Sequence, residues 1–284
     1  MPEAAAPVIA ISSWSVHRAL GIFHPNAPDN DVTGQAVEKW GPAKLSLMEL
    51  PERIAALGID RLQICHFHLE SRDPVYLGEV RATLDDAGVT LTSLLIDDGD
   101  VSNSTHAERD AAWIGRWIDA AAELGAKSAR VVAGKQKPSP ETLAASVEGL
   151  GALARRGAEQ GVRIMTENWL ALLASPKEVH HVLDRLDGEV GFLADFGNWR
   201  TQGPERYNDL ASIFARAEDT HAKAFFPNGL AMDDDDFRLC LAAAARVGYA
   251  GPYTLIYEDK GDDEWEAVKL ERDFVQSYFN GGHA

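Results

Sequence analysis

The chain has 284 residues, with 27 Lys and Arg against 44 Asp and Glu, which gives a formal net charge of −17 at pH 7. Because phosphate backbones and anionic membrane surfaces are bound by clustered basic side chains, this balance argues against a nucleic-acid partner and against a membrane partner. Hydrophobic residues make up 45% and charged residues 25%, values that are ordinary for a soluble globular protein.

The two cysteines, Cys65 and Cys240, are too few for a disulfide framework and form no Cys-x-x-Cys motif. The first basic residue is Arg18, so the N-terminal residues lack the basic region of a secretory signal. The longest segment without charged side chains, 4–17, is too short to span a membrane as a helix. We therefore expect a cytoplasmic protein, in a compartment where thiols stay reduced.

Short Val/Ile/Leu-rich runs alternate with helical stretches along the chain, as in proteins built from βα units around a parallel sheet. Eight runs are predicted as strands: 8–13, 61–66, 90–96, 128–133, 162–167, 190–195, 219–225 and 253–258. Four of the helices, 47–57, 77–87, 107–124 and 140–160, are each followed by a glycine, the usual C-cap residue.

Eight βα units predict a (β/α)8 TIM barrel in a single domain, 1–284, with its core at about 8–275. The alternative is an open doubly wound sheet, which usually has a Gly-rich phosphate loop after its first strand. Here residues 14–17 follow the first strand with the sequence Trp-Ser-Val-His, which contains no glycine. The long polar segment 21–41 is interpreted as an extended loop that could act as a lid.

Ionisable side chains occur at the carboxyl ends of the last four predicted strands, where TIM barrels place their active sites. In chain order they are Glu167, Asp195, His221 and Glu258. Three converging carboxylates would repel one another unless a positive charge lay between them, and one divalent cation would supply it. Oxygen ligands with one imidazole favour Mn²⁺ first, with Mg²⁺, Co²⁺ or Zn²⁺ as alternatives. The competing interpretation is a structural cluster of salt bridges.

Nearly the whole chain resembles the xylose isomerase-like TIM barrels, the sugar phosphate isomerase/epimerase group. These four residues are the most specific part of that resemblance. The resemblance implies that Glu167, Asp195, His221 and Glu258 bind one divalent metal ion. It also implies that Glu167 and Glu258 flank the substrate and serve as its acid and base.

A carboxylate can remove a proton from the carbon next to a carbonyl, and a nearby cation stabilises the enediolate that results. Return of the proton on the opposite face gives epimerisation, and transfer between carbons gives isomerisation. Loss of a β-leaving group gives elimination. The four residues alone do not choose among these three outcomes.

Three positions depart from the ketose 3-epimerase branch of this family. That branch has a His where this chain has Asn198, a substrate-binding Glu at Leu173, and an Arg at Pro227. The metal and acid/base chemistry therefore carry over from the resemblance, but a ketohexose substrate does not.

Several further side chains follow the predicted strands closely enough to contact a substrate. His66 and His68 alternate at the end of the second strand, so one of them is expected to point inward. The remaining candidates are His17, Trp169, Asn198 and Lys223. For each of these residues, packing or ion pairing within the barrel is the alternative.

We expect a metal-dependent epimerase or isomerase of a keto-sugar or polyol-derived ketone, with a small-molecule carbohydrate as its partner. The first alternative keeps the site but is a lyase or dehydratase that acts by β-elimination on an inosose or a 3-keto-glycoside. The second is a non-catalytic sugar-binding barrel. The resemblance also suggests a homo-oligomer.

Overall fold

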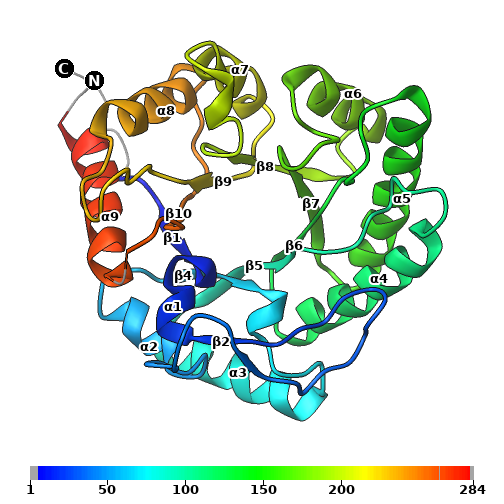
Figure 1. Cartoon of the computed structure of the whole chain (residues 1–284), viewed down its shortest axis with the longest axis horizontal. Coiled ribbons are helices and arrows are strands. Elements are labelled where there is room, and N and C mark those ends of the chain that lie inside the picture. Colours follow the sequence, from blue (N-terminus) through cyan, green and yellow to red (C-terminus); the bar gives the residue numbers. More distant parts are fainter. Residues whose placement is uncertain (1–5, 262, 282–284) are drawn as a thin grey trace.

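Eight parallel strands close into a barrel in the computed structural model, which describes residues 6–261 and 263–281. Around the barrel the order is β1-β10-β9-β8-β7-β6-β5-β4, so each strand lies beside its neighbour in the chain (Figure 1). The strands are β1 (Ile9–Ser12), β4 (Arg61–Cys65), β5 (Thr90–Ile96), β6 (Ser128–Val131), β7 (Arg163–Glu167), β8 (Gly191–Asp195), β9 (Asp219–Ala222) and β10 (Tyr253–Leu255). The predicted (β/α)8 TIM barrel is confirmed.

Helices form a ring outside the strands (Figure 1). They are α2 (Leu50–Ala55), α3 (Pro74–Ala87), α4 (Ala107–Glu123), α5 (Pro140–Glu159), α6 (Pro176–Leu186), α7 (Arg206–Phe214), α8 (Asp234–Arg246) and α9 (Glu264–Asn280). Helix α3 begins three residues before its predicted start because the side chain of Asp73 accepts a hydrogen bond from the backbone N–H of Val75. No helix in the described part of the chain has both the length and the apolar character needed to cross a membrane.

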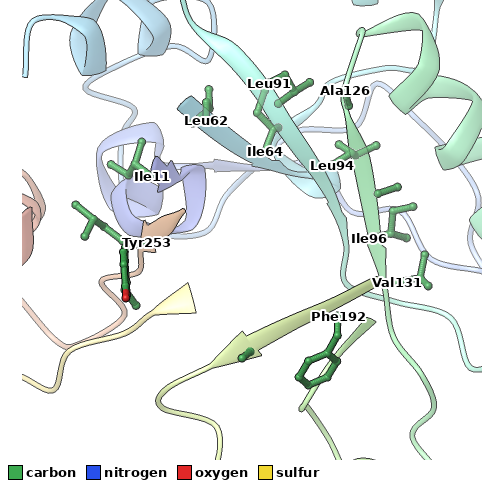
Figure 2. Packing of buried hydrophobic residues seen from close by; sticks show 14 of the residues in the cluster. Ile11, Leu62, Ile64, Leu91, Leu94, Ile96, Ala126, Val131, Phe192 and Tyr253 are labelled. Carbon is green, nitrogen blue, oxygen red and sulfur yellow. The ribbon is translucent and has the colours of Figure 1, made fainter. Parts of the chain in front are cut away.

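Alternate residues of each strand lie in two different environments. On β4, Leu62 and Ile64 belong to the large apolar cluster between the barrel and the helices (Figure 2). Cys65, on the other face of that strand, lines a cavity in the barrel. The same alternation on the other strands directs a second set of side chains into the barrel, and these build the site described below.

Two strands end three residues earlier than predicted. The seventh was expected to reach residue 225 and the eighth residue 258, but β9 ends at Ala222 and β10 at Leu255. Beyond β9 the N–H of Lys223 donates to the carbonyl of His221 at 2.9 Å, a tight turn that removes it from the sheet. The result is that Lys223 and Glu258 lie on the loops at the mouth of the barrel.

The segment 21–41 follows two short helices, η1 (Ser13–Val16) and α1 (His17–Leu20), and contains two short antiparallel strands, β2 (Ile22–Phe23) and β3 (Val37–Glu38). The side-chain oxygen of Asn26 accepts hydrogen bonds from the indoles of Trp113 and Trp117 on α4, at 2.7 and 3.0 Å. These bonds attach the segment to the barrel, and its movement as a lid stays a prediction.

Candidate active site

The carboxyl ends of the strands surround a cavity of about 410 Å³, a size typical of small-molecule sites. Its walls combine apolar and aromatic side chains with a concentrated set of charged ones. The lining residues are Ser12, Trp14, Cys65, Phe67, Leu95, Asp97, Arg130, Glu167, Trp169, Asn198, His221, Lys223, Ile256 and Glu258. Of the residues predicted for the site, this cavity brings together Glu167, Trp169, Asn198, His221, Lys223 and Glu258.

Glu167, Asp195 and His221 converge at this end of the barrel. Each offers one ligand atom, and these atoms all lie within 4.8 Å of one another. The Nδ1 atom of His221 lies 3.4 Å from Oε1 of Glu167 and 3.5 Å from Oδ2 of Asp195. All three side chains are buried. Three of the four residues that the sequence indicated as metal ligands therefore form one compact cluster.

The charges in this cluster are strongly coupled. Burial by itself lowers the pKa of His221, but the adjacent carboxylates of Glu167 and Asp195 outweigh it and raise that pKa to about 9. Burial raises the pKa of Asp195, but Lys223 and His221 outweigh it and hold that pKa well below its usual range. In the metal-free protein at neutral pH, Asp195 is thus ionised and His221 carries a proton, and the two charges stabilise each other.

The backbone after β8 orients Asp195. Its Oδ1 atom accepts hydrogen bonds from the N–H groups of Gly197 and Asn198, both at 2.7 Å. Oδ2 makes no hydrogen bond within the described residues, although the Nζ atom of Lys223 lies 3.2 Å away. A Cβ atom at Gly197 would lie only 2.5 Å from Cδ of Lys223, so a residue without a side chain is needed for this approach.

Glu258 lies apart from the three-residue cluster and is exposed at the mouth of the cavity. Its Oε2 atom lies 3.2 Å from Nζ of Lys223, and that ammonium group also lies 3.2 Å from Oδ2 of Asp195. Burial alone lowers the pKa of Lys223, but Asp195 and Glu258 raise it above the ordinary lysine value. A charged lysine thus lies between Asp195 and Glu258, and the role of Glu258 as a fourth ligand stays a prediction.

Asn198 links the cluster to Lys223. Its Nδ2 atom donates to Oε1 of Glu167 at 2.8 Å, and its Oδ1 accepts from the Lys223 ammonium at 3.3 Å. The Asn198 amide thus contacts both Glu167, a predicted ligand, and the Lys223 ammonium at the mouth of the cavity. Asn198 in place of the His of the ketose 3-epimerases therefore changes the immediate surroundings of the site.

Arg130 is the main charged side chain of the cluster that the sequence did not indicate for this role. It is buried on β6, with Nε 3.1 Å from Oε2 of Glu167, and it also pairs with Asp97. The ring of Trp169 covers the guanidinium, with its centroid 5.1 Å from Cζ. Arg130 faces inward on β6, the strand next to the one that ends at Glu167. That position is the signal that could have identified it.

Three predicted substrate contacts, His17, His66 and His68, lie outside the lining of the cavity. His17 stacks on Trp14 with ring centroids 4.2 Å apart, and burial lowers its pKa to about 4. The Nδ1 atom of His66 accepts from the N–H of Asp97, and Nδ1 of His68 pairs with the Ser13 hydroxyl.

The reason for the last two placements is local. A short 3₁₀ helix, η2 (His66–His68), follows β4 directly, so the alternation of a strand no longer applies to these positions. We therefore leave these histidines, and with them His17, out of the substrate site proposed below.

The donor set fits a divalent cation. Two carboxylates and one imidazole are close enough to share one ion, and oxygen atoms of both carboxylates are buried without a hydrogen bond among the described residues. Carboxylate oxygens with a single imidazole suit Mn²⁺ and Mg²⁺.

The sequence profile of the xylose isomerase-like TIM barrels matches residues 51–278. The chain belongs to this family. No curated protein that was compared with the chain matches it.

Several solved structures share the fold of this xylose isomerase-like protein. A family member from Mycobacterium smegmatis in complex with magnesium has 17% identity and a TM-score of 0.69, with full coverage of both chains. An L-ribulose 3-epimerase has 14% identity and a TM-score of 0.70, covering 97% of this chain and 95% of its own. The E. coli 3-keto-D-glucoside 4-epimerase has 16% identity and a TM-score of 0.65, covering 82% of this chain and 94% of its own.

Proposed function

We propose that the protein is a divalent-metal-dependent epimerase or isomerase that acts on a keto-sugar or polyol-derived ketone. The observation that carries this proposal is the buried cluster of Glu167, Asp195 and His221, which opens into a cavity of small-molecule size. The likeness to sugar epimerases of several specificities supports it. The active form is expected to hold one ion, with Mn²⁺ as the first candidate.

Glu167, Asp195 and His221 would hold the cation, with Glu258 completing the set from the mouth of the cavity. When bound, the ion supplies positive charge next to the carbonyl oxygen of the substrate. Asp195 and His221 serve as ligands only, because the carboxylate and the imidazole are both buried and fixed by neighbours.

Glu167 and Glu258 are proposed as the acid and base. They lie on β7 and after β10, so two strands of the barrel separate them. Glu167 is held by Arg130 and Asn198, whereas Glu258 is exposed and contacts Lys223. Glu258 is therefore the freer carboxylate to take a proton from the carbon next to the carbonyl. A proton returned from the other side of the substrate would invert that carbon.

Other side chains of the cavity would bind the sugar. Trp14, Phe67 and Trp169 offer aromatic faces to the C–H groups of a sugar ring. Asn198 and Lys223 offer hydrogen-bond donors for hydroxyl or carbonyl oxygens, once they release their present partners. This mixture of aromatic and polar groups suits a small carbohydrate.

The test is proton exchange in D₂O. The protein is stripped of metal with a chelator, reloaded with Mn²⁺, and incubated with D-fructose, D-psicose, L-ribulose and a methyl 3-keto-glucoside. The proposal expects deuterium to enter next to the carbonyl and an isomer of the substrate to form that differs in mass only by the deuterium taken up, as followed by NMR. The double variant Asp195→Asn with His221→Ala should show neither result.

The other outcomes contradict the proposal in identifiable ways. An unsaturated product or a released aglycone would make the protein a lyase or dehydratase that uses the same residues. Binding of a sugar without any deuterium exchange would leave a non-catalytic sugar-binding barrel.

A further inference from the structure

Buried polar side chains cross the interior of the barrel one layer below the candidate cation site. Gln63 on β4, Asp219 on β9 and Thr254 on β10 are all buried. Strands β4 and β9 are not neighbours, because β1 and β10 lie between them in the barrel. Gln63 therefore reaches through the interior to residues on strands with which β4 does not pair.

The hydrogen bonds of this layer fix the orientation of the Gln63 amide. Its Nε2 atom donates to Oδ2 of Asp219 at 2.9 Å and to Oγ1 of Thr254 at 3.2 Å. The other Asp219 oxygen, Oδ1, accepts from the Thr254 hydroxyl at 3.0 Å and from the N–H of Thr220 at 2.7 Å. A reversed amide would place an acceptor oxygen of Gln63 against an acceptor oxygen of Asp219. The Asp219 carboxylate therefore allows the Gln63 amide only one of its two orientations.

The amide oxygen of Gln63 contacts His221, a predicted metal ligand. Oε1 of Gln63 lies 2.9 Å from Nε2 of His221. An amide oxygen can only accept a hydrogen bond, so Nε2 of His221 must carry a proton. The other ring atom, Nδ1, is then the one that faces Glu167 and Asp195.

We propose that Gln63 and Asp219 are positioning residues that hold the His221 ring with Nε2–H toward Gln63 and Nδ1 toward the cation. Asp219 acts on Gln63, and Gln63 acts on His221, so neither residue touches the substrate. Metal-ligating histidines in general donate their second ring N–H to an acceptor that fixes the ring. The part of this inference that concerns cation binding rests on the proposed function. The part that concerns the orientation of the His221 ring does not depend on it.

The composition of this layer supports a role beyond packing. The interior of a TIM barrel is usually filled by branched apolar side chains. Burial of an amide and a carboxylate there is unfavourable unless their hydrogen bonds are made. In this chain every polar atom of the Gln63 side chain has a partner, and one of those partners is His221.

The experiment compares Gln63→Leu with a matched control in the same layer. Ser93 on β5 is paired in register with Gln63, is buried, and its hydroxyl has no hydrogen-bond partner among the described residues. Ser93→Ala therefore changes the same interior without touching His221. Asp219→Asn is the second test, because an Asn side chain would direct an N–H donor toward Gln63, Thr254 or Thr220, all of which donate to Asp219.

The first readout is the Nε2–H resonance of His221 in the metal-free, ¹⁵N-labelled protein, assigned to this residue by its loss in His221→Asn. Because both ring nitrogens carry a proton at neutral pH in the metal-free protein, Nε2–H is distinguished from Nδ1–H by the strong coupling of Nε2 to both ring C–H protons. The wild type and Ser93→Ala should show one slowly exchanging, downfield Nε2–H signal. Gln63→Leu and Asp219→Asn should shift it or broaden it by exchange with solvent. A signal that is unchanged in both variants would overturn the proposal.

The second readout is the Mn²⁺ affinity measured by calorimetry. Gln63→Leu should bind Mn²⁺ about 10- to 100-fold more weakly than the wild type, the usual effect of removing such a partner. Ser93→Ala should stay within about twofold. Equal affinities in Gln63→Leu and Ser93→Ala would overturn the role in cation binding. If the wild type binds no Mn²⁺, the proposed function fails, and the ring signal alone then decides whether Gln63 orients His221.

Discussion

Arg130 and Glu167 form a buried ion pair at the end of neighbouring strands, with Nε of the guanidinium 3.1 Å from Oε2 of the carboxylate. Arg130 also pairs with Asp97, so one cation balances two carboxylates. We expect Arg130→Gln to destabilise the metal-free protein by about 3 to 5 kcal/mol, because it leaves buried charge without compensation. Urea unfolding of the metal-free protein measures this effect.

An exposed ion pair provides the control for this prediction. Arg155 and Glu189 lie 3.8 Å apart with both side chains more than half exposed. Arg155→Gln should change the free energy of unfolding by no more than about 1 kcal/mol, as expected for surface pairs. If the two substitutions had equal effects, burial would not be what makes the Arg130 pair important.

Much of the barrel was predictable because local patterns determine it. Buried parallel strands read as short apolar runs, and each of the eight predicted runs contains a strand of the barrel. Strand ends on adjacent strands of such a sheet meet at one edge, which is why Glu167, Asp195 and His221 could be placed together before their distances were known.

Contacts across the barrel were not predictable in the same way. Gln63 and His221 are far apart in the chain and lie on strands that do not pair, so their contact depends on the tilt and stagger of the closed barrel. The register of β4 with β5 also shifts between Leu62 and Gln63. At His66 and His68 the strand ends in a 3₁₀ turn, which no alternation of residue types signals.

Protons and the cation should compete for His221. The pKa of His221 is raised to about 9 in the metal-free protein, because the carboxylates of Glu167 and Asp195 outweigh its burial. Cation binding needs the neutral imidazole, so affinity should rise with pH, by about tenfold per unit, and level off near pH 9. Calorimetry in buffers of different ionisation enthalpy should detect about one proton released per Mn²⁺ bound at pH 7.5. Binding without proton release would show that His221 is not a ligand.

Lys223 should weaken cation binding while it assists turnover. Its ammonium lies 3.2 Å from Oδ2 of Asp195, the oxygen that faces the cluster. Lys223→Met removes this like charge, and Asp195 stays in place because two backbone N–H groups hold its other oxygen. We expect Mn²⁺ to bind at least about tenfold more tightly to the variant, since an ammonium in contact with a ligand oxygen lies close to any cation bound there, and nearby charges interact strongly even at a protein surface.

The measurement for Lys223 is a Mn²⁺ titration by calorimetry at low and high salt, with Lys223→Arg as the matched control. The arginine keeps the charge and should keep the wild-type affinity within a few fold. Turnover should fall in Lys223→Met if the ammonium helps to orient Glu258. Weaker Mn²⁺ binding in Lys223→Met would instead assign the lysine a role in building the site.

Replacing Glu258 or Asp195 by its amide should have different effects on cation binding and on turnover. Asp195 is fully buried in the three-residue cluster, whereas Glu258 is exposed and contacts the Lys223 ammonium. Asp195→Asn should therefore abolish cation binding, and activity with it. Glu258→Gln should weaken Mn²⁺ binding much less but lower kcat by about 10²- to 10⁴-fold, the range typical of losing a general base. Metal content by elemental mass spectrometry and kcat measured at saturating Mn²⁺ distinguish the two cases. If Glu258→Gln lost its metal as fully as Asp195→Asn, Glu258 would be an indispensable ligand, and Glu167 would become the stronger candidate for the base.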